Sequence, residues 1–423
     1  MLSPSLVSLL HAAGTIELDD AAIAVALRCW MFIGDDTPFK RIRVLPAGGK
    51  LTWTPGEPVK VEGQFIFGKR ASISRDDAID EYISLFRTAV ARRPASGTSI
   101  VPLSGGRDSR HIFLELCASG MAPDVAVTVG GWKQQTSDGQ LAAALAERAG
   151  VRHVAISLPE SRWRAQTSTI PATHLCTFEH WWLVDFISYL EQFKGQASIY
   201  EGAAGDVLST AIFKSEAKRR LYDDGKFREL AASLLGNEKY FRQVLPPVWY
   251  ERFGRDSAVD RLITELQRHA DAPNPLASFY VYNRTRRVTA LPPTTLFSPH
   301  AKVWCPYLDA DVWDFLSSLG PELLEDDEIF SFHDDAIHRA YPNFADIPFS
   351  AKWGAKAHRR SYDLRTVAEM AVGVAHVRGI PLRDAYIWPR LVRGLVDPSF
   401  IADASDLTPL VSYLAALAAF ARL

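Results

Sequence analysis

Apolar and polar positions change their pattern most sharply between residues 99 and 117. Small, β-branched and apolar residues fill Ser99–Leu103, as in a buried strand. From His111 to Cys117 the apolar residues recur at helical spacing. Residues 104–109, between these segments, are two serines, two glycines, an arginine and an aspartate. The pattern predicts a strand, a tight loop and a helix in direct succession.

The following residues repeat this alternation. We expect a buried strand at Asp124–Val129, a helix over residues 137–149 and a third strand at Val151–Leu158. Strands and helices that alternate at this spacing predict an α/β fold with a doubly wound, mostly parallel sheet. Ligands of such sheets bind beyond the carboxyl ends of the strands, which is where residues 104–109 are expected to lie.

The first 72 residues predict a small mixed unit. Asp19 and Asp20 precede an apolar helix face, which predicts a capped helix through Cys29 and Phe32. Glycines and prolines then separate two short strands, expected at Ile42–Leu45 and Leu51–Trp53. A helix capped by Ser74 opens the next unit. We therefore divide the chain into residues 1–72, a large domain at 73–395 and a helical C-terminal tail at 396–423.

Composition narrows the classes of partner and compartment. Lys and Arg total 47 and Asp and Glu total 49, so we expect no nucleic-acid ligand. The N-terminus lacks a signal-peptide pattern, and the apolar run Leu410–Leu423 is too short to span a membrane. Four separated cysteines are typical of reduced thiols: Cys29, Cys117, Cys176 and Cys305. These features favour a cytoplasmic protein that contacts no membrane.

The loop at residues 104–109 carries groups that suit an anion. Backbone N–H groups and serine hydroxyls at a helix N-terminus attract a phosphate chain. No lysine follows in a Gly-Lys-Ser/Thr pattern, so the loop is not a Walker loop. Asp108 would repel phosphate unless a Mg²⁺ ion lay between them. An ordinary glycine turn is the alternative interpretation.

A second stretch of this kind lies at Ser198–Leu208, where a short apolar strand runs into small residues and Asp206. A carboxylate facing Asp108 across a sheet crevice would complete a Mg²⁺ site.

Aromatic residues between 160 and 195 are expected to pack helices on the sheet, or else to line a substrate site. The run Asn283–Arg287 is expected just before a loop. Its arginines could contact phosphate or could form a charged surface, and the sequence does not decide between these two roles. Asp309 is expected to cap a helix.

Ser104-Gly105-Gly106-Arg107-Asp108-Ser109 resembles the pyrophosphate loop of ATP pyrophosphatases that form adenylated intermediates. Three further segments resemble the asparagine synthetases of that superfamily. They are Gly34–Leu51, similar to the end of their glutaminase domain, Gly202–Asp206, similar to their Gly-Glu-Gly-(Ser/Ala/Gly)-Asp motif, and Pro348–Gly354, similar to their Pro…Lys-X-Gly segment. The resemblance implies a sheet of the ATP-pyrophosphatase (HUP-like) type, preceded by a glutaminase remnant.

The resemblance also implies the site residues. ATP would contact Leu103, Ser104, Gly105, Gly106, Asp108, Ser109, Val129, Gly202 and Asp206. Asp108 and Asp206 would hold Mg²⁺. Lys352 would stabilise the charge that develops at the α-phosphate, with Lys356 as the alternative.

The sequence departs from the family motif at two positions. The first of them, occupied here by Ala203, normally carries a group that assists the second half-reaction. Ala203 stands where asparagine synthetases have Glu and β-lactam synthetases have Tyr, and Val207 replaces a Glu. The chain begins Met1-Leu2-Ser3, without the glutaminase cysteine. The N-terminal unit is therefore expected to supply no ammonia.

The resemblance implies an ATP- and Mg²⁺-dependent ligase that adenylates a substrate carboxylate and transfers the acyl group to an amine, without glutamine. We expect a biosynthetic amide synthetase or a macrolactam-forming cyclase, acting on small-molecule or peptide carboxylates and amines. Two alternatives stay open, an ammonia-using asparagine synthase and a non-catalytic nucleotide-binding relative. A homodimer or a partner protein from the same pathway is compatible with each. Charge balance and cysteine spacing argue against an RNA-modifying relative.

Overall fold

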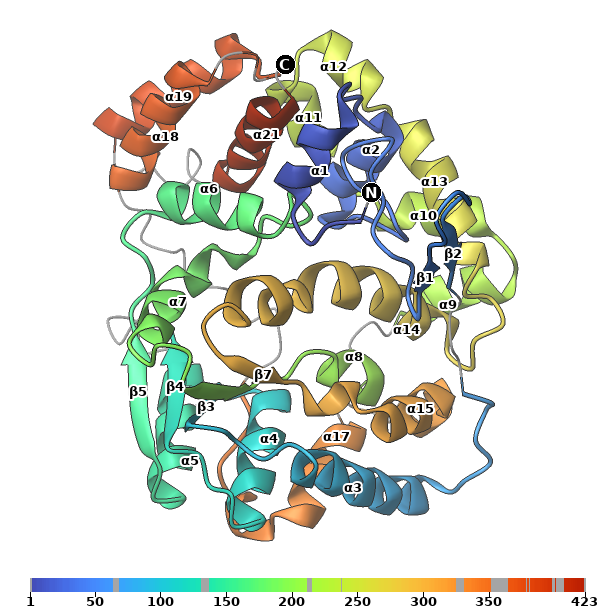
Figure 1. The fold of residues 1–423 in the computed structure, drawn as a ribbon, viewed down its shortest axis with the longest axis vertical. Coiled ribbons are helices and arrows are strands. Elements are labelled where there is room, and N and C mark those ends of the chain that lie inside the picture. The colour runs from blue at the N-terminus through green and yellow to red at the C-terminus, as the bar shows by residue number, and fades with distance from the viewer. Residues whose placement is uncertain are drawn as a thin grey trace.

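The structure is a computed structural model that describes residues 2–63, 68–130, 137–210, 215–236, 238–324, 331–350, 364–377, 379, 381–397, 400 and 407–421. Figure 1 shows a sheet with its helices in the lower half of the view and a mainly helical upper half. A long helical run crosses between these halves. It consists of α14 (Pro275–Tyr280) and two π-helices, η2 (Val281–Thr289) and η3 (Pro292–Phe297).

The central sheet has five strands, all parallel, in the order β5-β4-β3-β6-β7. They are β3 (Thr98–Pro102), β4 (Val125–Val129), β5 (Arg152–Ile156), β6 (Ala197–Tyr200) and β7 (Lys302–Trp304). From β3 the chain moves outward to β4 and β5, then returns to the other side of β3 for β6 and β7. The winding direction therefore reverses between β3 and β6. The expected α/β class and parallel sheet are confirmed.

Both faces of the sheet are buried because its side chains alternate. Val101 and Ala126 join a core with α3 (Arg75–Ala91), α4 (Asp108–Ala118) and α5 (Ser137–Arg148). Ile100 and Val127 face the opposite core, formed with α7 (Val184–Glu191) and η3. Phe186 of α7 lies edge-on to Phe297 of η3. Phe186, Tyr189 and Phe193 thus pack α7 and its end on the sheet, as expected. Trp163 and Phe178 belong instead to the helical core with α2 (Asp20–Cys29) and α21 (Thr408–Ala421).

Helix caps follow the local sequence closely. Asp19 Oδ1 accepts from Ala22 N at the start of α2 (Asp20–Cys29), and Ser74 Oγ accepts from Asp77 N at the start of α3. Asp309 accepts from Asp311 N at the start of α15 (Ala310–Ser318). These three caps are confirmed. The reason is that a cap is a contact between residues two or three positions apart. Helix α2 ends at Cys29 and not at Phe32, because Trp30 takes a left-handed conformation that stops the helix.

The strand expected at Ile42–Leu45 is wrong. Its backbone bonds to its own loop, because Thr37 Oγ1 donates to Ile42 O and Val44 N donates to Asp35 O. The second expected strand is β1 (Lys50–Thr52), which pairs antiparallel with β2 (Lys60–Glu62). A turn that satisfies its own carbonyl and amide groups leaves nothing for a strand partner.

The N-terminal residues share their core with distant parts of the chain. Helix α2 packs against α13 (Arg255–Gln267), and both belong to a core that includes α6 (Arg162–Ala172) and α21 (Thr408–Ala421). The division of the chain at residues 72 and 395 stays a prediction.

The further helices of the described chain are α1 (Leu6–Ala13), α8 (Gly205–Ser209), α9 (Glu216–Asp223), α10 (Phe227–Leu234), α11 (Glu238–Val244), α12 (Pro247–Arg252), α16 (Pro321–Leu324), α17 (Ser331–Ala340), α18 (Leu364–His376), α19 (Asp384–Val396) and the 3₁₀ turns η1 (His180–Leu183), η4 (Pro306–Leu308) and η5 (Pro342–Phe344).

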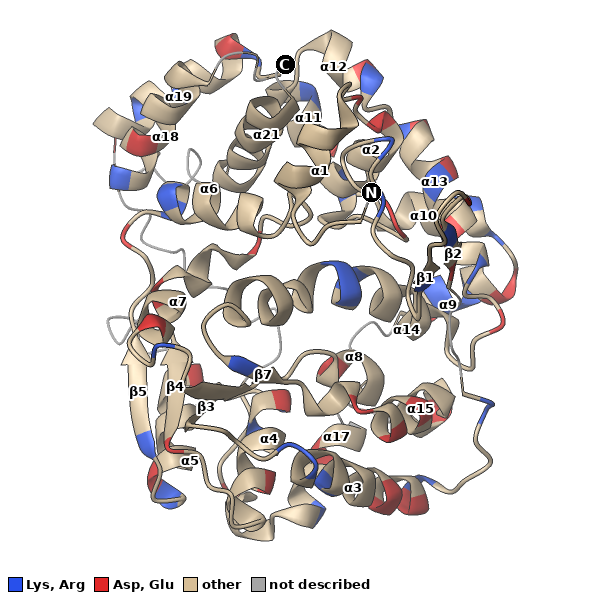
Figure 2. Ribbon diagram, in the orientation of Figure 1, with Lys and Arg blue, Asp and Glu red and all other residues tan. Residues whose placement is uncertain are grey.

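The distribution of charged side chains and the state of the cysteines agree with the expectations from composition. Figure 2 shows acidic and basic residues interspersed on the outer helices α12, α13 and α18. All four cysteines are free. Among the helices that the structure describes, none combines the length and the apolar character needed to cross a membrane.

The run Asn283–Arg287 lies inside η2 and not before a loop, so this prediction is wrong. Asn283 Oδ1 accepts from Gly34 N, and Arg287, which is 2% exposed, donates to the carbonyl oxygens of Gly34 and Asp36 at 2.6 Å each. Arg286 also donates to Gly34 O. These side chains tie the N-terminal loop to the crossing helix.

Replacing Arg287 with Met should lower the free energy of unfolding by about 3 kcal/mol or more. The change removes two hydrogen bonds from a charged donor to carbonyl oxygens, and such bonds contribute roughly 1.5–3 kcal/mol each. Arg286 still donates to Gly34 O, so Asp36 O is the carbonyl that loses its charged donor. Urea denaturation measures the loss. As a control, Arg228→Met breaks an exposed ion pair with Asp260 and should cost less than about 1 kcal/mol. Equal losses in the two variants would contradict the role assigned to Arg287.

Candidate functional site

The candidate site lies where the winding of the sheet reverses, at the carboxyl ends of β3 and β6. Residues 104–109 follow β3, and residues 201–206 follow β6. In open α/β sheets, the crevice at such a reversal is the general place for a ligand. The two stretches singled out from the sequence are therefore neighbours in space.

The loop after β3 is held by its own serines. Ser104 N donates to Ser109 Oγ at 3.0 Å, the two hydroxyls lie 3.0 Å apart, and Gly106 N donates to Ser104 Oγ at 3.1 Å. Gly105 is required by close packing, since an added Cβ would lie 2.9 Å from Leu141 Cδ1 of α5. The loop thus presents two hydroxyl groups and backbone N–H groups in a fixed arrangement.

Helix α4 begins at Asp108 without a side-chain cap, so its first N–H groups are not used by a capping residue. Arg107, just before it, forms a two-point ion pair with Asp334 of α17, at 2.7 and 2.9 Å. The N-terminus of α4 has the properties of an anion site, whereas Arg107 is engaged in holding α17.

The turn after β6 lies directly against Asp108. A Cβ added at Gly202 would lie 3.0 Å from Asp108 Cβ, and one added at Gly205 would lie 2.7 Å from Asp108 Oδ1. The hydroxyl of Tyr307 donates to Asp108 O at 3.1 Å. Only glycine allows so close an approach at both positions. The structure therefore brings Gly202 and Asp206 to the Asp108 loop, as predicted.

Three carboxyl groups meet here. Burial, together with the charge of Asp206, raises the pKa of Asp108 well above its usual range. Burial also raises the pKa of Asp206, opposed by the Val207 N–H and by Arg284. Burial raises the pKa of Glu201 to about 7, opposed by the Ala203 N–H and increased by Asp206. Carboxyl groups that oppose one another's ionisation in this way favour a bound cation.

Two of these carboxyl groups fit the ligand preference of Mg²⁺. Asp108 Oδ1 is buried and has no hydrogen-bond partner, although the side chain as a whole is 24% exposed. Mg²⁺ in nucleotide sites commonly takes one or two carboxylates and completes its shell with phosphates and water. Across the described ranges, no group of three His, Cys, Asp or Glu side chains is arranged to hold a metal ion. The residues present fit a metal shared with a nucleotide.

The segment before residue 351 docks on the same loop. Ser350 N donates to Gly105 O at 2.8 Å, and Arg110 donates to Ile347 O and Pro348 O at 2.7 Å each. The ring of Phe349 lies under the Arg110 guanidinium, 4.3 Å from its centroid. Lys352 and Lys356 fall outside the residues that the structure describes, so the role of each stays a prediction.

Two other predicted contacts lie at the strand ends. Leu103 is buried, its N–H donates to Val127 O, and its carbonyl accepts from the Thr128 hydroxyl. Val129 ends β4 and is half-buried in the core on the α7 face. Leu103 therefore uses its backbone groups within the sheet.

Sequence reasoning assigned no role to Glu201 or His333, and it left Arg284 open between phosphate contact and surface charge. Glu201 was part of the stretch noted after β6, and its acidic side chain at a strand end was the available signal. Arg284 of η2 donates to Glu179 at 2.6 Å and lies near enough to Asp206 to affect its pKa. His333 of α17 lies 3.6 Å from Asp108 Oδ1 and is fully buried. Nothing in the local sequence around His333 marks this contact.

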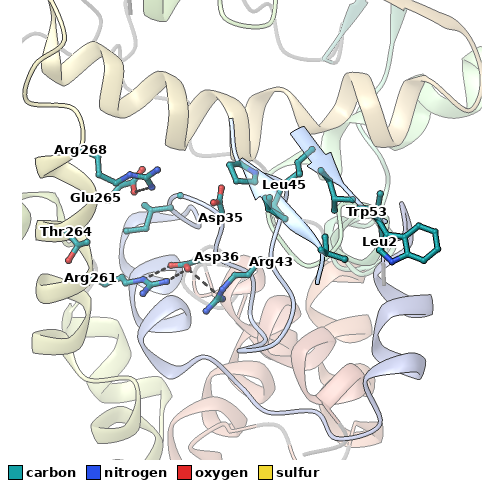
Figure 3. A pocket seen from close by; sticks show the side chains of 17 residues that line it. Leu2, Asp35, Asp36, Arg43, Leu45, Trp53, Arg261, Thr264, Glu265 and Arg268 are labelled. Carbon is teal, nitrogen blue, oxygen red and sulfur yellow. Dashed lines mark hydrogen bonds and ion pairs between the residues drawn. The ribbon is translucent and has the colours of Figure 1, made fainter. Parts of the chain in front are cut away.

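A separate cavity of about 1000 Å³ lies beside the β1–β2 hairpin, as Figure 3 shows. Apolar side chains such as Trp53 line one wall. The opposite wall is charged, but Asp36 there is paired with Arg261 and Arg43, and Glu265 is paired with Arg268. None of the described residues that line this cavity belongs to residues 104–109 or 201–206, so the cavity is separate from the candidate site at the reversal of the sheet.

No protein-family model matches this chain, and comparison with curated proteins gives no significant match.

The contribution of Glu201 to stability should rise as the pH falls from 8 towards 5. An opposite contribution comes from buried His111, His180 and His333, whose pKa values are lowered by burial. The Glu201 carboxyl has an ordinary pKa of 4.5 and a pKa of about 7 in the folded protein, so the folded state holds a proton that the unfolded state has lost. This difference corresponds to about 3 kcal/mol of destabilisation above pH 7, relieved at lower pH. Glu201→Gln should therefore stabilise the protein more at pH 8 than at pH 5.

Denaturation midpoints at pH 5, 6.5 and 8 measure this effect. Part of the slope should remain in Glu201→Gln, because the pKa values of Asp108 and Asp206 are also raised. Exposed Glu57, replaced with Gln, controls for the loss of one carboxyl group. An unchanged slope in Glu201→Gln would show that this carboxyl is ionised in the folded protein throughout.

Proposed function

We propose that this chain is an ATP- and Mg²⁺-dependent ligase of the asparagine synthetase-like kind, which activates a carboxylate as its adenylate and joins it to an amine. The observation that carries the proposal is the position of the Ser104–Ser109 loop and of Asp206, on the two sides of the sheet's switch point. Phosphate-binding groups and paired carboxylates at one crevice suit a metal–nucleotide complex better than either feature alone.

The residues divide the work by their chemistry. The hydroxyls of Ser104 and Ser109 and the free N–H groups at the start of α4 would bind the pyrophosphate part of ATP. Asp108 and Asp206 would hold Mg²⁺, which neutralises phosphate charge when bound. The substrate carboxylate oxygen would attack the α-phosphorus, the bond to the β-phosphate oxygen would break, and pyrophosphate would leave.

A lysine is the suitable group for the charge that develops at the α-phosphorus and on the leaving pyrophosphate. We propose Lys352 for this role. Its sequence position supports the proposal, because Ser350, two residues earlier, is hydrogen-bonded to Gly105 of the phosphate loop. Lys356 is the alternative.

In the second step the amine nitrogen attacks the acyl carbon, AMP leaves, and the nitrogen loses a proton. Glu201 is proposed to accept this proton, because it lies at the carboxyl end of β6 beside Asp206, with one oxygen fixed by the Ala203 N–H, and its pKa is raised towards the pH of the reaction. The amine is a small-molecule or peptide amine, an amine of the same molecule, or ammonia. The family's Glu or Tyr at position 203 and Glu at position 207 are replaced here by Ala203 and Val207. These replacements favour a biosynthetic amide synthetase or a macrolactam-forming cyclase over an asparagine synthase.

The proposal is tested by Mg²⁺-dependent ATP–pyrophosphate exchange over a panel of carboxylates and peptides. Exchange that depends on one carboxylate supports adenylation, and amide formation on adding amines identifies the second substrate. Nucleotide binding without exchange for any carboxylate would favour the non-catalytic alternative. Absence of Mg²⁺-dependent nucleotide binding would refute the assignment of the site.

Asp108→Asn and Asp206→Asn should each abolish Mg²⁺-dependent ATP binding while the fold survives. Each change removes one of the two carboxylates proposed to hold the metal. Because the pKa of both groups is raised, their neutral replacements should leave the melting temperature unchanged or higher. Calorimetric titration with Mg·ATP measures binding. Asp346→Asn, at an exposed ion pair, is the matched control, and undiminished binding in both site variants would contradict the metal assignment.

Lys352→Ala should slow AMP formation by about a hundred- to a thousand-fold, because a cation placed at developing charge contributes roughly 3–4 kcal/mol. ATP affinity should fall far less, since the loop and metal bind the ground state. Single-turnover AMP formation and ATP affinity are measured on the same variant. Equal losses of both would make Lys352 a ground-state binding residue. Loss of neither, with loss of rate in Lys356→Ala, would move the role to Lys356.

A further inference from the structure

Behind Asp108 lies a buried cluster of polar rings that the proposed chemistry does not use. His333 of α17 is fully buried beside His111 of α4 and beside Tyr82 and Tyr307. Its Nε2 atom lies 3.2 Å from His111 Nδ1 and 3.4 Å from each tyrosine hydroxyl. These contacts fix the plane of the imidazole ring. The opposite ring nitrogen, Nδ1, faces the candidate site.

The network assigns the hydrogen on His333 Nδ1. Ser209 Oγ lies 2.6 Å from Gly205 O, and a carbonyl oxygen can only accept, so the single hydroxyl hydrogen goes there. Ser209 Oγ must then accept from His333 Nδ1, 2.9 Å away. His333 therefore carries its hydrogen on Nδ1 whether or not Nε2 is protonated. This hydrogen is directed at Ser209 Oγ, and Asp108 Oδ1 lies near the same nitrogen, 3.6 Å away.

Asp108 Oδ1 is enclosed on that side. It lies 3.6 Å from His333 Nδ1, too far for a full hydrogen bond but close enough for attraction between the N–H dipole and the carboxylate. Gly205 approaches so closely that an added Cβ would lie 2.7 Å from Oδ1. Oδ1 makes no hydrogen bond of normal geometry, and the exposed part of the side chain belongs to its remaining atoms. The backbone N–H of Asp206 also lies close enough to this carboxyl group to lower its pKa. One oxygen is held inward and the other is left for the crevice.

We propose that His333 is a positioning residue for Asp108: its Nδ1–H, donated to Ser209, attracts the neighbouring Oδ1 electrostatically and keeps it inward, so that Oδ2 is oriented for a divalent cation bound with a nucleotide. The inference rests on the proposed function, because it concerns the Mg²⁺ ligand of that site. Partners that orient a metal ligand commonly change metal affinity by about 10- to 100-fold when they are removed. The effect belongs to the N–H donor and not to the bulk of the ring.

Asn and Gln at position 333 separate these two contributions. The amide of Asn reaches about as far as Nδ1 of histidine, whereas the amide of Gln reaches about as far as Nε2. His333→Asn therefore keeps a donor towards Asp108, and His333→Gln and His333→Leu do not. His269→Leu is the matched control, because His269 is equally buried but lies in the other hydrophobic core, hydrogen-bonded to Ser278.

The experiment titrates the full-length protein with Mn²⁺ in the presence of the α,β-methylene analogue of ATP, following free Mn²⁺ by electron paramagnetic resonance. We expect His333→Gln and His333→Leu to weaken Mn²⁺ binding by about tenfold or more, His333→Asn by less than about threefold, and His269→Leu not at all. Melting temperatures report folding separately. If the Leu variant does not fold, the Asn and Gln pair carries the test.

Two results would overturn the inference alone: wild-type affinity in His333→Gln, or equal weakening in His333→Asn and His333→Gln. Failure of the wild-type protein to bind Mn²⁺ with the nucleotide analogue would overturn the proposed function and the positioning role together. The two failures are thus distinguished by the wild-type titration.

Discussion

The close approach of the turn after β6 to Asp108 is the contact on which the candidate site depends. Gly202 and Gly205 have no side chains, so the backbone after β6 can lie against the first turn of α4. This contact closes the crevice at the switch point of the sheet. It brings Asp108 and Asp206 together, although almost a hundred residues separate them in the sequence. A larger residue at either glycine would force the two strand ends apart.

Bringing acids together in a buried place costs free energy, and the structure shows how the cost is limited. The N–H groups of Val207 and Ala203 and the guanidinium of Arg284 oppose the rise in the pKa values of Asp206 and Glu201. They do not cancel it, since all three carboxyl groups stay harder to ionise than in water. A divalent cation would complete the balance, which is the physical reason for expecting a metal–nucleotide complex here.

A second constraint joins the two halves of the molecule. The π-helix η2 carries Asn283 and Arg287 on the turn of backbone that meets Gly34, and Arg284 at the edge of the candidate site. Wider π-helical turns are common where a helix must present side chains to a functional site. The same helix thus anchors the N-terminal loop and contributes a charge near Asp206. The N-terminal segment is a structural part of the molecule through this contact.

The sequence by itself determined the local features: the strand–loop–helix unit at residues 98–118, the caps at Asp19, Ser74 and Asp309, and the presence of an acid after each of two strands. These features depend on residues a few positions apart, so the apolar periodicity and the capping hydrogen bonds can be predicted from a short stretch of sequence. The meeting of Asp108 with Asp206 was expected from the acid after each strand, but only the tertiary structure decided the order of the strands and the position of His333 beside these acids. It also turned the expected strand at Ile42–Leu45 into a self-bonded loop and the arginines of η2 into an internal tie. Such contacts join residues far apart in the chain, and no local pattern records which distant group will satisfy a buried charge or carbonyl.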